Sequence, residues 1–492
     1  MQPSSTGASV ATPDALAQPT PKTAAGPKTA AAQANAAARQ DAAARQSTAA
    51  RRSAATAAGP KIAADAATNA ATAETVAAAT ADDRHRPGQR AFRRANLALF
   101  AAGIATFVLL YSTQGLLPVL SSDLDLTPGQ ASWTASAATL GLALALLPAS
   151  ALSDRYGRTA VMTASVLAAS ALALALPFAP DLTTLVVLRV LQGAALAGLP
   201  ATAMAYLAEE VHPSALASAM GLYVAGNSIG GMGGRLLSGW VAAGFGWRWG
   251  LAASAALALL AALAFRLLIP AARHFAPAPV DARALARTVG RHLGNPLLVR
   301  LYLLGMLFMA VFGAVYNTVG YRLIAAPFHL PESVAASIFV VYLVGTGTSA
   351  AAGRLSGRLG RRGALYVAIG TTAAGLLLSL ADSLACALLG LVLITAGFFA
   401  GHATASSAVG RTATEGRAQA SALYLIAYYL GNSLGGTVGA DAYHSTGWPG
   451  AAAVGLAAMA LAAGVTLYAT RRAHTAATLR RAEGLPGGLS AR

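Results

Sequence analysis

The sequence predicts an all-α membrane protein with about twelve transmembrane helices in two pseudo-symmetric six-helix halves. Three observations support this fold class. Hydrophobic residues make up 56% of the chain and charged residues only 11%, which is typical of membrane proteins. Apolar stretches of about 20 residues, long enough to cross a bilayer as helices, recur from residue 95 onward. Finally, two sequence motifs each occur twice, at similar positions in the two halves.

The first repeated motif reads Gly-Asn-Ser-Ile-Gly-Gly at residues 226–231 and Gly-Asn-Ser-Leu-Gly-Gly at residues 431–436. The second begins with Leu-Ser and continues with Arg, Gly and Arg at residues 152–158 and again at 355–361. Because the two pairs have nearly the same separation, one unit has been duplicated. Many secondary transporters are built in this way, with the substrate site between the halves.

The predicted spans divide the chain into five parts. Residues 1–90 form a tail, 91–270 the N-terminal six-helix half, 271–295 a cytoplasmic linker, 296–470 the C-terminal six-helix half and 471–492 a second tail. We expect the spans to begin near Ala95, Ala131, Thr159, Leu182, Ser214, Trp247, Pro296, Ser333, Gly363, Ser383, Ala418 and Gly450.

The N-terminal tail is rich in Ala, Thr, Gln and Pro and has no aromatic residue before Phe92. A segment with so few large apolar side chains cannot build a core, which predicts a disordered cytoplasmic tail. A transit peptide and an over-extended start of translation are the alternatives.

The net charge of +17 would suggest a nucleic-acid partner in a soluble protein, but the placement of the arginines argues against one. Arginines cluster before the first span, after the second and after the eighth, whereas the first-to-second and ninth-to-tenth links carry aspartates. By the positive-inside rule, both termini lie in the cytoplasm. Arg248 and Arg322, on the outer side, are exceptions that leave the alternation intact.

In the linker, Arg283, Arg287 and Arg291 recur at spacing four with Ala and Leu between them. This spacing indicates a short amphipathic helix on the anionic inner leaflet. A solvated linker is the alternative.

Several function classes find no support in the sequence. Cys386 is the single cysteine, so the chain offers neither an internal disulfide nor a cysteine metal cluster. No phosphate-binding glycine loop indicates direct ATP drive, and no nucleophile or metal-ligand arrangement indicates an enzyme. We therefore expect no catalytic residues, no metal and no other cofactor.

Residues 150–158, between the second and third spans, resemble the loop signature of the major facilitator superfamily, Gly-x-x-x-Asp-Arg-x-Gly-Arg, with Ser150 in place of the first glycine. The resemblance implies a charge-relay latch between the halves that is closed in the outward-facing state, formed by Asp154, Arg155, Gly157 and Arg158. Glu209 or Glu210, at the end of the fourth span, is the expected partner of Arg158. Alternatively, the arginines are only topology markers.

The duplicate loop carries Arg358, Gly360 and Arg361 as further latch candidates. Gly357 stands where the first copy has Asp154, so a latch in this half cannot use the same pairing.

Two residues are candidates for proton coupling. Arg189, with Gln192 and Gly193, resembles the superfamily motif Arg-x-x-Gln-Gly, which is associated with proton transfer in proton-coupled members; snorkelling toward the outer interface is the alternative. His402 is the only histidine well inside a span, and its ordinary pKa of about 6.5 suits a proton relay. A neutral histidine bonded to a backbone carbonyl is the competing interpretation.

The fifth span resembles the antiporter motif Gly-x8-Gly-x3-Gly-Pro-x2-Gly-Gly, which marks export members of the superfamily. Arg235 replaces the expected proline, and Ser238 replaces a glycine. Glycines at spacing four lie on one helix face and allow another helix to approach closely. The predicted packing motif comprises Gly221, Gly226, Gly230, Gly234, Arg235 and Gly239.

Residues 111–118 of the first span look like the start of a bacterial efflux subgroup, Tyr-x-x-Gln-Pro-Leu-Leu-Pro, that includes arabinose-efflux-permease-like and YnfM-like proteins. The resemblance covers residues from about 95 to 470. It implies the major facilitator fold in a bacterial inner membrane, with a central cavity lined by the first, fourth, seventh and tenth spans.

Polar and aromatic residues in these spans, together with two symmetric asparagines, are the candidate cavity residues: Tyr111, Gln114, Gln192, Asn227, Tyr316, Asn317 and Asn432. Helix packing is an equal alternative for the asparagines of the repeat. No Asp or Glu falls at mid-depth in a predicted span, which favours a neutral, polar or weakly amphipathic solute over a polycation.

Three functions remain open. The favoured one is proton-coupled efflux of small solutes, drugs or sugars, by alternating access. An importer of a sugar or other metabolite on the same fold and a non-transporting membrane sensor are the alternatives. The expected partners are a small-molecule substrate, protons and the lipid bilayer, without nucleic acid, and we expect a monomer.

Overall fold

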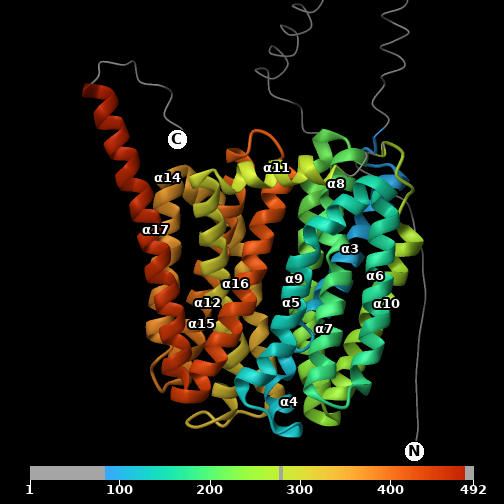
Figure 1. Ribbon diagram of the computed structural model, residues 1–492. Helices are drawn as coiled ribbons and strands as arrows, with labels where there is room; N and C mark the ends of the chain where they lie inside the picture. The colour runs from blue at the N-terminus through green and yellow to red at the C-terminus, as the bar shows by residue number, and fades with distance from the viewer. Residues whose placement is uncertain (1–83, 276, 278–280, 483–492) are drawn as a thin grey trace, which may run out of the picture. The chain divides into compact units, whose positions relative to one another are not determined.

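The computed structural model describes residues 84–275, 277 and 281–482. The disorder predicted for residues 1–90 concerns a segment that lies almost wholly outside these described residues. Within them the chain is helical almost throughout, and its only β-type pairing is an isolated bridge between His85 and Val211. Figure 1 shows one bundle built from α3 to α10 and a second built from α12 to α17.

The N-terminal bundle contains six spans, three of which are built from more than one helical piece. The first consists of α3, η1 and α4, the third of α6 and η2, and the fourth of α7 and α8. The elements are α3 (Arg90–Tyr111), η1 (Gln114–Leu116), α4 (Leu117–Asp123), α5 (Pro128–Tyr156), α6 (Arg158–Ala175), η2 (Leu176–Phe178), α7 (Leu182–Leu196), α8 (Gly198–Glu210), α9 (Pro213–Phe245) and α10 (Trp247–Leu268).

The C-terminal bundle repeats this plan after the linker helix. Its eighth and ninth spans share α14, which is interrupted at Gly360, where the backbone φ is +69°. The elements are α11 (Ala282–Leu293) in the linker, then α12 (Pro296–Ile324), α13 (Glu332–Ala336), η3 (Ser337–Val341), α14 (Tyr342–Leu378), α15 (Leu384–Thr412), α16 (Arg417–Thr446) and α17 (Trp448–Ala482).

Nine of the described helical segments are long and apolar enough to cross a membrane by length and composition alone. One of the nine, Glu332–Leu378, contains the break at Gly360 and therefore holds two of the predicted spans. The remaining two predicted spans, α9 and α16, are not among the nine; both are rich in glycine and polar residues. These two helices carry the repeated glycine motif.

Helix starts follow local capping chemistry. Thr127 forms a capping box with Gln130, in which each side chain bonds the other residue's backbone N–H, and Pro128 occupies the first turn of α5. Asp281 accepts bonds from the first N–H groups of α11, and Asn295 does the same for α12. The linker therefore contains the amphipathic helix expected from its arginine spacing.

The repeated glycines hold two equivalent helix pairs together. A methyl group at Gly230 would lie 2.6 Å from the carbonyl oxygen of Ile104 in α3, and one at Gly234 would lie 2.8 Å from the Cα atom of Val108. In the second half, Gly431, Gly435 and Gly439 of α16 meet the α12 residues Met306, Ala310 and Ala314 in the same way. The spacing of four residues on both partners lets the backbones of these helices touch along their length.

Gly221, which the export motif includes, is not part of this contact. It is exposed, and no atom lies within 4 Å of the position that its Cβ would take. The stripe facing α3 begins instead at Gly226, where an added Cβ would collide with the backbone of Phe100.

Candidate functional site

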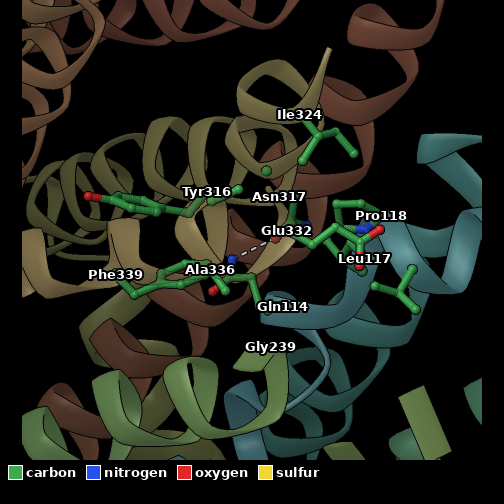
Figure 2. A pocket seen from close by; sticks show the side chains of 14 residues that line it. Gln114, Leu117, Pro118, Gly239, Tyr316, Asn317, Ile324, Glu332, Ala336 and Phe339 are labelled. Atoms are coloured by element: carbon green, nitrogen blue, oxygen red, sulfur yellow. Dashed lines mark hydrogen bonds between the residues drawn. The ribbon is translucent and has the colours of Figure 1, made fainter. Parts of the chain in front are cut away.

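A pocket lined by residues of α4 and α13 lies between the two halves (Figure 2). It lies at the end of the bundle that carries α4, which we call the distal end (Figure 1). The opposite end, which carries α11, is called the linker end. The pocket is narrow and has room for about one water molecule. Its labelled walls come from both halves: Gln114, Leu117, Pro118, Gly239, Tyr316, Asn317, Ile324, Glu332, Ala336 and Phe339.

The pocket forms where the first span is broken. Helix α3 ends at Tyr111, and the chain continues through a short turn into η1 at Gln114. Gly115 follows, and a side chain there would collide with the carbonyl oxygen of Arg235 in α9. The break therefore turns the Gln114 side chain toward α12 of the other half.

Arg189 stabilises this break from α7. Its guanidinium donates to the carbonyl oxygens of Leu109 at 2.7 Å, Leu110 at 2.6 Å and Thr134 at 2.8 Å. The last carbonyls of α3 have no partners within the helix, so an arginine is well suited to satisfy them. Arg189 is fully buried and does not snorkel toward an interface.

Gln192, a predicted cavity residue, lies inside the N-terminal half instead. Its Oε1 accepts a 2.6 Å bond from Arg189, and its Nε2 donates to the carbonyl of Ala169 at 3.3 Å. It is fully buried and does not line the pocket between the halves. The spacing of three residues places Gln192 beside Arg189 on one face of α7, where the two side chains bond each other.

A chain of hydrogen bonds crosses from one half to the other beside the pocket. Arg235 Nε donates to Gln114 Oε1 at 2.6 Å, and Gln114 Nε2 donates to Asn317 Oδ1 at 2.6 Å. Figure 2 shows the second of these bonds. The chain links α9, the first span and α12, so the predicted cavity residues Gln114 and Asn317 do meet.

Other contacts also join the halves at the distal end. The hydroxyl of Tyr321 in α12 lies 2.6 Å from that of Ser121 and donates to the carbonyl of Leu117 at 2.8 Å. The indole of Trp240 in α9 donates to the hydroxyl of Ser337 at 2.9 Å. Together with the Gln114 bridge, these bonds close the distal end.

Arg235 is the residue whose place in the site sequence reasoning missed. Its guanidinium carbon lies 3.8 Å from the ring centre of Tyr111, 4.5 Å from that of Tyr342 and 5.4 Å from that of Phe339. Its Nη1 donates to the carbonyl of Gly231 at 2.6 Å, and the residue is 1% exposed. The sequence signal was present, since this position departs from the proline of the export motif.

The remaining tyrosine and the two asparagines of the repeat have different surroundings. The Tyr316 hydroxyl lies 2.5 Å from that of Thr395, on the C-terminal side of the pocket. Asn432 Nδ2 donates to Thr139 at 3.1 Å and so helps join α16 to α5. Asn227 instead packs against Gly103 of α3, within the N-terminal half. Both asparagines thus lie at contacts between helices, Asn227 within one half and Asn432 between the halves, even though their sequence motifs are nearly identical.

At the linker end, the predicted latch residues bond within the N-terminal half. Arg158 Nη2 lies 2.8 Å from Glu209, and its Nη1 bonds both Asp154 and Ser153. Gly157 makes the turn before α6 with a φ of +100°, a value that favours glycine. Arg155 is exposed and stacks on the neighbouring ring of Tyr156.

Glu210 has a separate task at the linker end. It is fully buried, and its carboxylate accepts bonds from the backbone N–H groups of Arg273 at 2.7 Å and His274 at 2.8 Å. It therefore anchors the start of the linker, and Glu209 is the glutamate that bonds Arg158.

A pocket at the linker end separates Asp154 from the C-terminal half. It is bounded by Ser150 and Asp154 of α5, by α11 and by Gln419 of α16. Across the described residues, Asp154 and Arg158 form no hydrogen bond or ion pair with the C-terminal half. The latch residues are thus assembled but not joined to the other half.

The second copy of the loop has the same turn with different charges. Gly360 has a φ of +69°, equivalent to Gly157. No atom lies within 4 Å of the position that a Cβ on Gly357 would take, and the loop's charged residues Arg358 and Arg361 have no acidic neighbour in the loop sequence. The loop therefore keeps the turn of the first copy without an acid at the position equivalent to Asp154.

His402 lies in α15, inside the C-terminal half. Its Nδ1 is 2.9 Å from the Tyr424 hydroxyl of α16, and its ring stacks on Phe398 and contacts Tyr428. Its partner is thus a tyrosine hydroxyl rather than a backbone carbonyl. Elsewhere in the part of the chain that the structure describes, His, Cys, Asp and Glu side chains form no group of three that could hold a metal ion.

Comparisons with known proteins agree with this architecture. The model of the Major Facilitator Superfamily matches residues 97–322 and 301–491. The inner membrane transport protein YnfM of Escherichia coli is 41% identical over 389 residues, which cover 79% of this chain and 93% of YnfM. The uncharacterized MFS-type transporter YybF of Bacillus subtilis is 40% identical over 365 residues, which cover 74% of this chain and 90% of YybF.

Among solved structures, a bacterial homologue of the human lysosomal transporter Spinster, in an inward-facing and occupied conformation, aligns with a TM-score of 0.63 at 19% identity. The alignment covers 78% of this chain and 98% of that protein, so the two share a fold. The predicted fold of about twelve helices is thereby confirmed. Because its relatives are transporters over nearly their full length, the protein is not an enzyme. The chain is a multi-pass membrane transporter that belongs to the Major Facilitator Superfamily, in its YnfM-like group.

Proposed function

We propose that this protein exports a small solute from the bacterial cytoplasm across the inner membrane, in exchange for protons, by alternating access. One observation supports the proposal that the protein works by alternating access. Direct bonds join the halves at the distal end, including the Gln114–Asn317 pair, whereas a pocket separates Asp154 from the other half at the linker end. This difference between the two ends is what an inward-facing transporter requires, with the linker end on the cytoplasmic side.

The charge distribution supports this orientation. Arg155 and Arg158 follow α5 at the linker end, and Arg358 and Arg361 occupy the equivalent loop. Positive residues collect on the cytoplasmic side of membrane proteins. Both termini would then be cytoplasmic.

The direction of transport rests on the fifth span. The glycine stripe of α9 makes backbone contact with α3, which leaves no space for water between the two helices. Such a dry contact limits leakage while a solute gradient is maintained. Import remains the second candidate, because Arg235 replaces the proline of the export motif and Gly221 takes no part in the contact.

Two residues were predicted to couple transport to protons, and we retain one of them as a candidate proton carrier. His402 is bonded to Tyr424 inside the C-terminal half, and an imidazole nitrogen can accept and release a proton. Arg189 is occupied by backbone carbonyls, so we assign it to holding the first span in place rather than to carrying protons.

The test measures solute accumulation in cells that express the full chain, with and without a protonophore. A panel of sugars and fluorescent drugs is compared for the wild type, Asp154→Asn and the exposed distal aspartate variant Asp123→Asn. Export predicts reduced accumulation that returns to the level of empty cells with Asp154→Asn or the protonophore, while Asp123→Asn behaves like the wild type.

Other results would contradict the proposal in different ways. Raised accumulation that the protonophore abolishes would make the protein an importer. Accumulation equal to that of empty cells for every solute, with the protein present in the membrane, would favour the non-transporting sensor.

A further inference from the structure

Arg235 is one of three deeply buried arginines of the bundle, and it makes fewer hydrogen bonds than Arg189. Arg189 makes four, three of them to backbone carbonyls. Arg322 donates to the carbonyls of Ser379 and Ala381. The guanidinium of Arg235 donates to Gly231 and Gln114 and lies over the ring of Tyr111. A guanidinium has five N–H donors, so Arg235 retains unused bonding capacity.

The charge of Arg235 also has no counter-ion. It forms no ion pair with any carboxylate of the described residues. The acid that lines the adjacent pocket, Glu332, is exposed and is not bonded to Arg235. A buried, uncompensated charge is unfavourable, and in membrane proteins such a charge commonly marks a substrate or ion pathway.

Two buried polar groups near the bridge lack partners. Asn317 accepts the bond from Gln114 through Oδ1, while its buried Nδ2, which faces Gly436 of α16, has no partner. The buried hydroxyl of Tyr342 also has none, and the Tyr342 ring lies 4.5 Å from the guanidinium. The site thus presents donors and a positive charge without an acceptor to match. A carboxylate is the complementary group, because it offers only acceptors and a negative charge.

Aromatic rings form the rest of the surroundings. Tyr111 and Tyr342 flank Arg235, and Tyr316 packs on Tyr342 and Phe339 with ring centres 5.0 and 5.8 Å apart. In this closed conformation the rings are buried against Arg235 and one another, and they would contact the apolar body of a ligand once the site opens.

We propose, on the basis of the transport function above, that the substrate is an organic anion, an aromatic or similarly apolar monocarboxylate, and that Arg235 binds its carboxylate. The sequence alone favoured a neutral solute, because no acid lies at mid-depth to pair with a cation. The buried arginine favours a negatively charged solute instead.

The same contact explains why the site is closed in this conformation. Arg235 bonds Gln114, and Gln114 bonds Asn317 of the other half, so the arginine supports the distal closure. A carboxylate that binds Arg235 in the bidentate manner, through Nε–H and an Nη–H, competes with the Gln114 amide for the Nε–H. Binding therefore loosens the bridge between the halves, which links substrate occupancy to opening of the distal end.

The test compares two probes of nearly the same shape, benzoate and neutral benzamide, on the purified full-length protein in lipid nanodiscs. Binding is measured by isothermal titration calorimetry. We expect benzoate to bind at least about tenfold more tightly than benzamide, because a charge-assisted bond to a guanidinium is worth at least that ratio. This comparison uses the wild type, so it stands even if a variant fails to fold.

Variants then locate the contact. Arg235→Gln should abolish the preference for benzoate, and Arg235→Lys, which keeps the charge but not the planar fork, should retain part of it. Arg322→Lys is the matched control, since Arg322 is a buried arginine that stacks on Trp448 away from the pocket between the halves, and it should keep the full preference. Equal binding of the two probes to the wild type, or an undiminished preference in Arg235→Gln, would overturn the proposal.

Proteoliposome flux separates this inference from the proposed function. Preferential benzoate binding without movement of benzoate would leave the anion site in place and refute transport of this class. Movement of sugars or neutral drugs by protein that does not prefer benzoate would support transport and reject the anion site.

Discussion

The two glycine stripes make a quantitative prediction about packing between α9 and α3. In Gly230→Ala, the new Cβ would lie 2.6 Å from the carbonyl oxygen and 2.7 Å from the Cα of Ile104. Both are backbone atoms, so no side-chain rotation relieves the collision. Ordinary contacts begin at 3.4 Å, and the helices must therefore separate locally by roughly 0.8 Å.

The same helix contains the matched control. Gly233 lies three residues further on, and no atom comes within 4 Å of its Cβ position. Gly233→Ala should be neutral or stabilise the protein by up to about 1 kcal/mol, because alanine is the better helix former. Overpacking of a tight contact costs about 1–3 kcal/mol, so Gly230→Ala should be less stable than Gly233→Ala by about 1–4 kcal/mol.

The assay is SDS-induced unfolding of the purified variants in mixed micelles, followed by circular dichroism. The quantity tested is the difference in the free energy of unfolding between Gly230→Ala and Gly233→Ala. If Gly230→Ala proves as stable as Gly233→Ala, the close contact between α9 and α3 is not what holds these helices together, and the explanation given for the repeat is wrong.

Three further predictions concern single contacts. Gln114→Leu and Asn317→Leu should be non-additive by about 0.5–3 kcal/mol in a double-mutant cycle of unfolding free energies, because the two side chains bond each other; additive effects would contradict the bridge. Gly157→Ala and Gly157→Asn should each lower the free energy of unfolding by about 1–3 kcal/mol, because a φ of +100° with a ψ of 147° is a conformation that almost only glycine adopts, whereas stability equal to the wild type in both would show that the turn relaxes. His402→Phe should abolish proton-driven flux in proteoliposomes but leave solute binding, while Tyr424→Phe, which removes only the hydroxyl partner, should retain flux; full proton coupling without the imidazole would exclude His402 as the carrier.

Composition and spacing predicted much of the fold. Runs of apolar residues of membrane-crossing length located the helices, since the bilayer leaves few alternatives to helix for such segments. The latch residues Gly157 and Gly360, equivalent in the duplicated loop, both have a positive φ, of +100° and +69°. The pairing of Arg158 with one of two adjacent glutamates was anticipated as well, although the sequence left Glu209 and Glu210 as equal candidates.

The individual site residues were less predictable because polar side chains in neighbouring helices compete for the same partners. Gln192 fell in a cavity-lining span, yet it bonds Arg189 inside its own half. Asn227 and Asn432 occupy equivalent positions, yet only Asn432 reaches the other half. Rotation of a helix by one residue changes the face that a side chain presents, and spacing alone does not determine that rotation.

By itself, the sequence determined the membrane character, the duplication and the glycine faces of α9 and α16, because hydropathy and periodicity are properties of contiguous residues. Only the tertiary structure decided the meaning of Arg235. Its partners Gln114, Gly231, Tyr111 and Tyr342 come from three spans, and its lack of a counter-ion is evident only when every neighbouring helix is in place. A charge acquires its function from what surrounds it, and those surroundings are assembled by packing between segments that are distant in the chain.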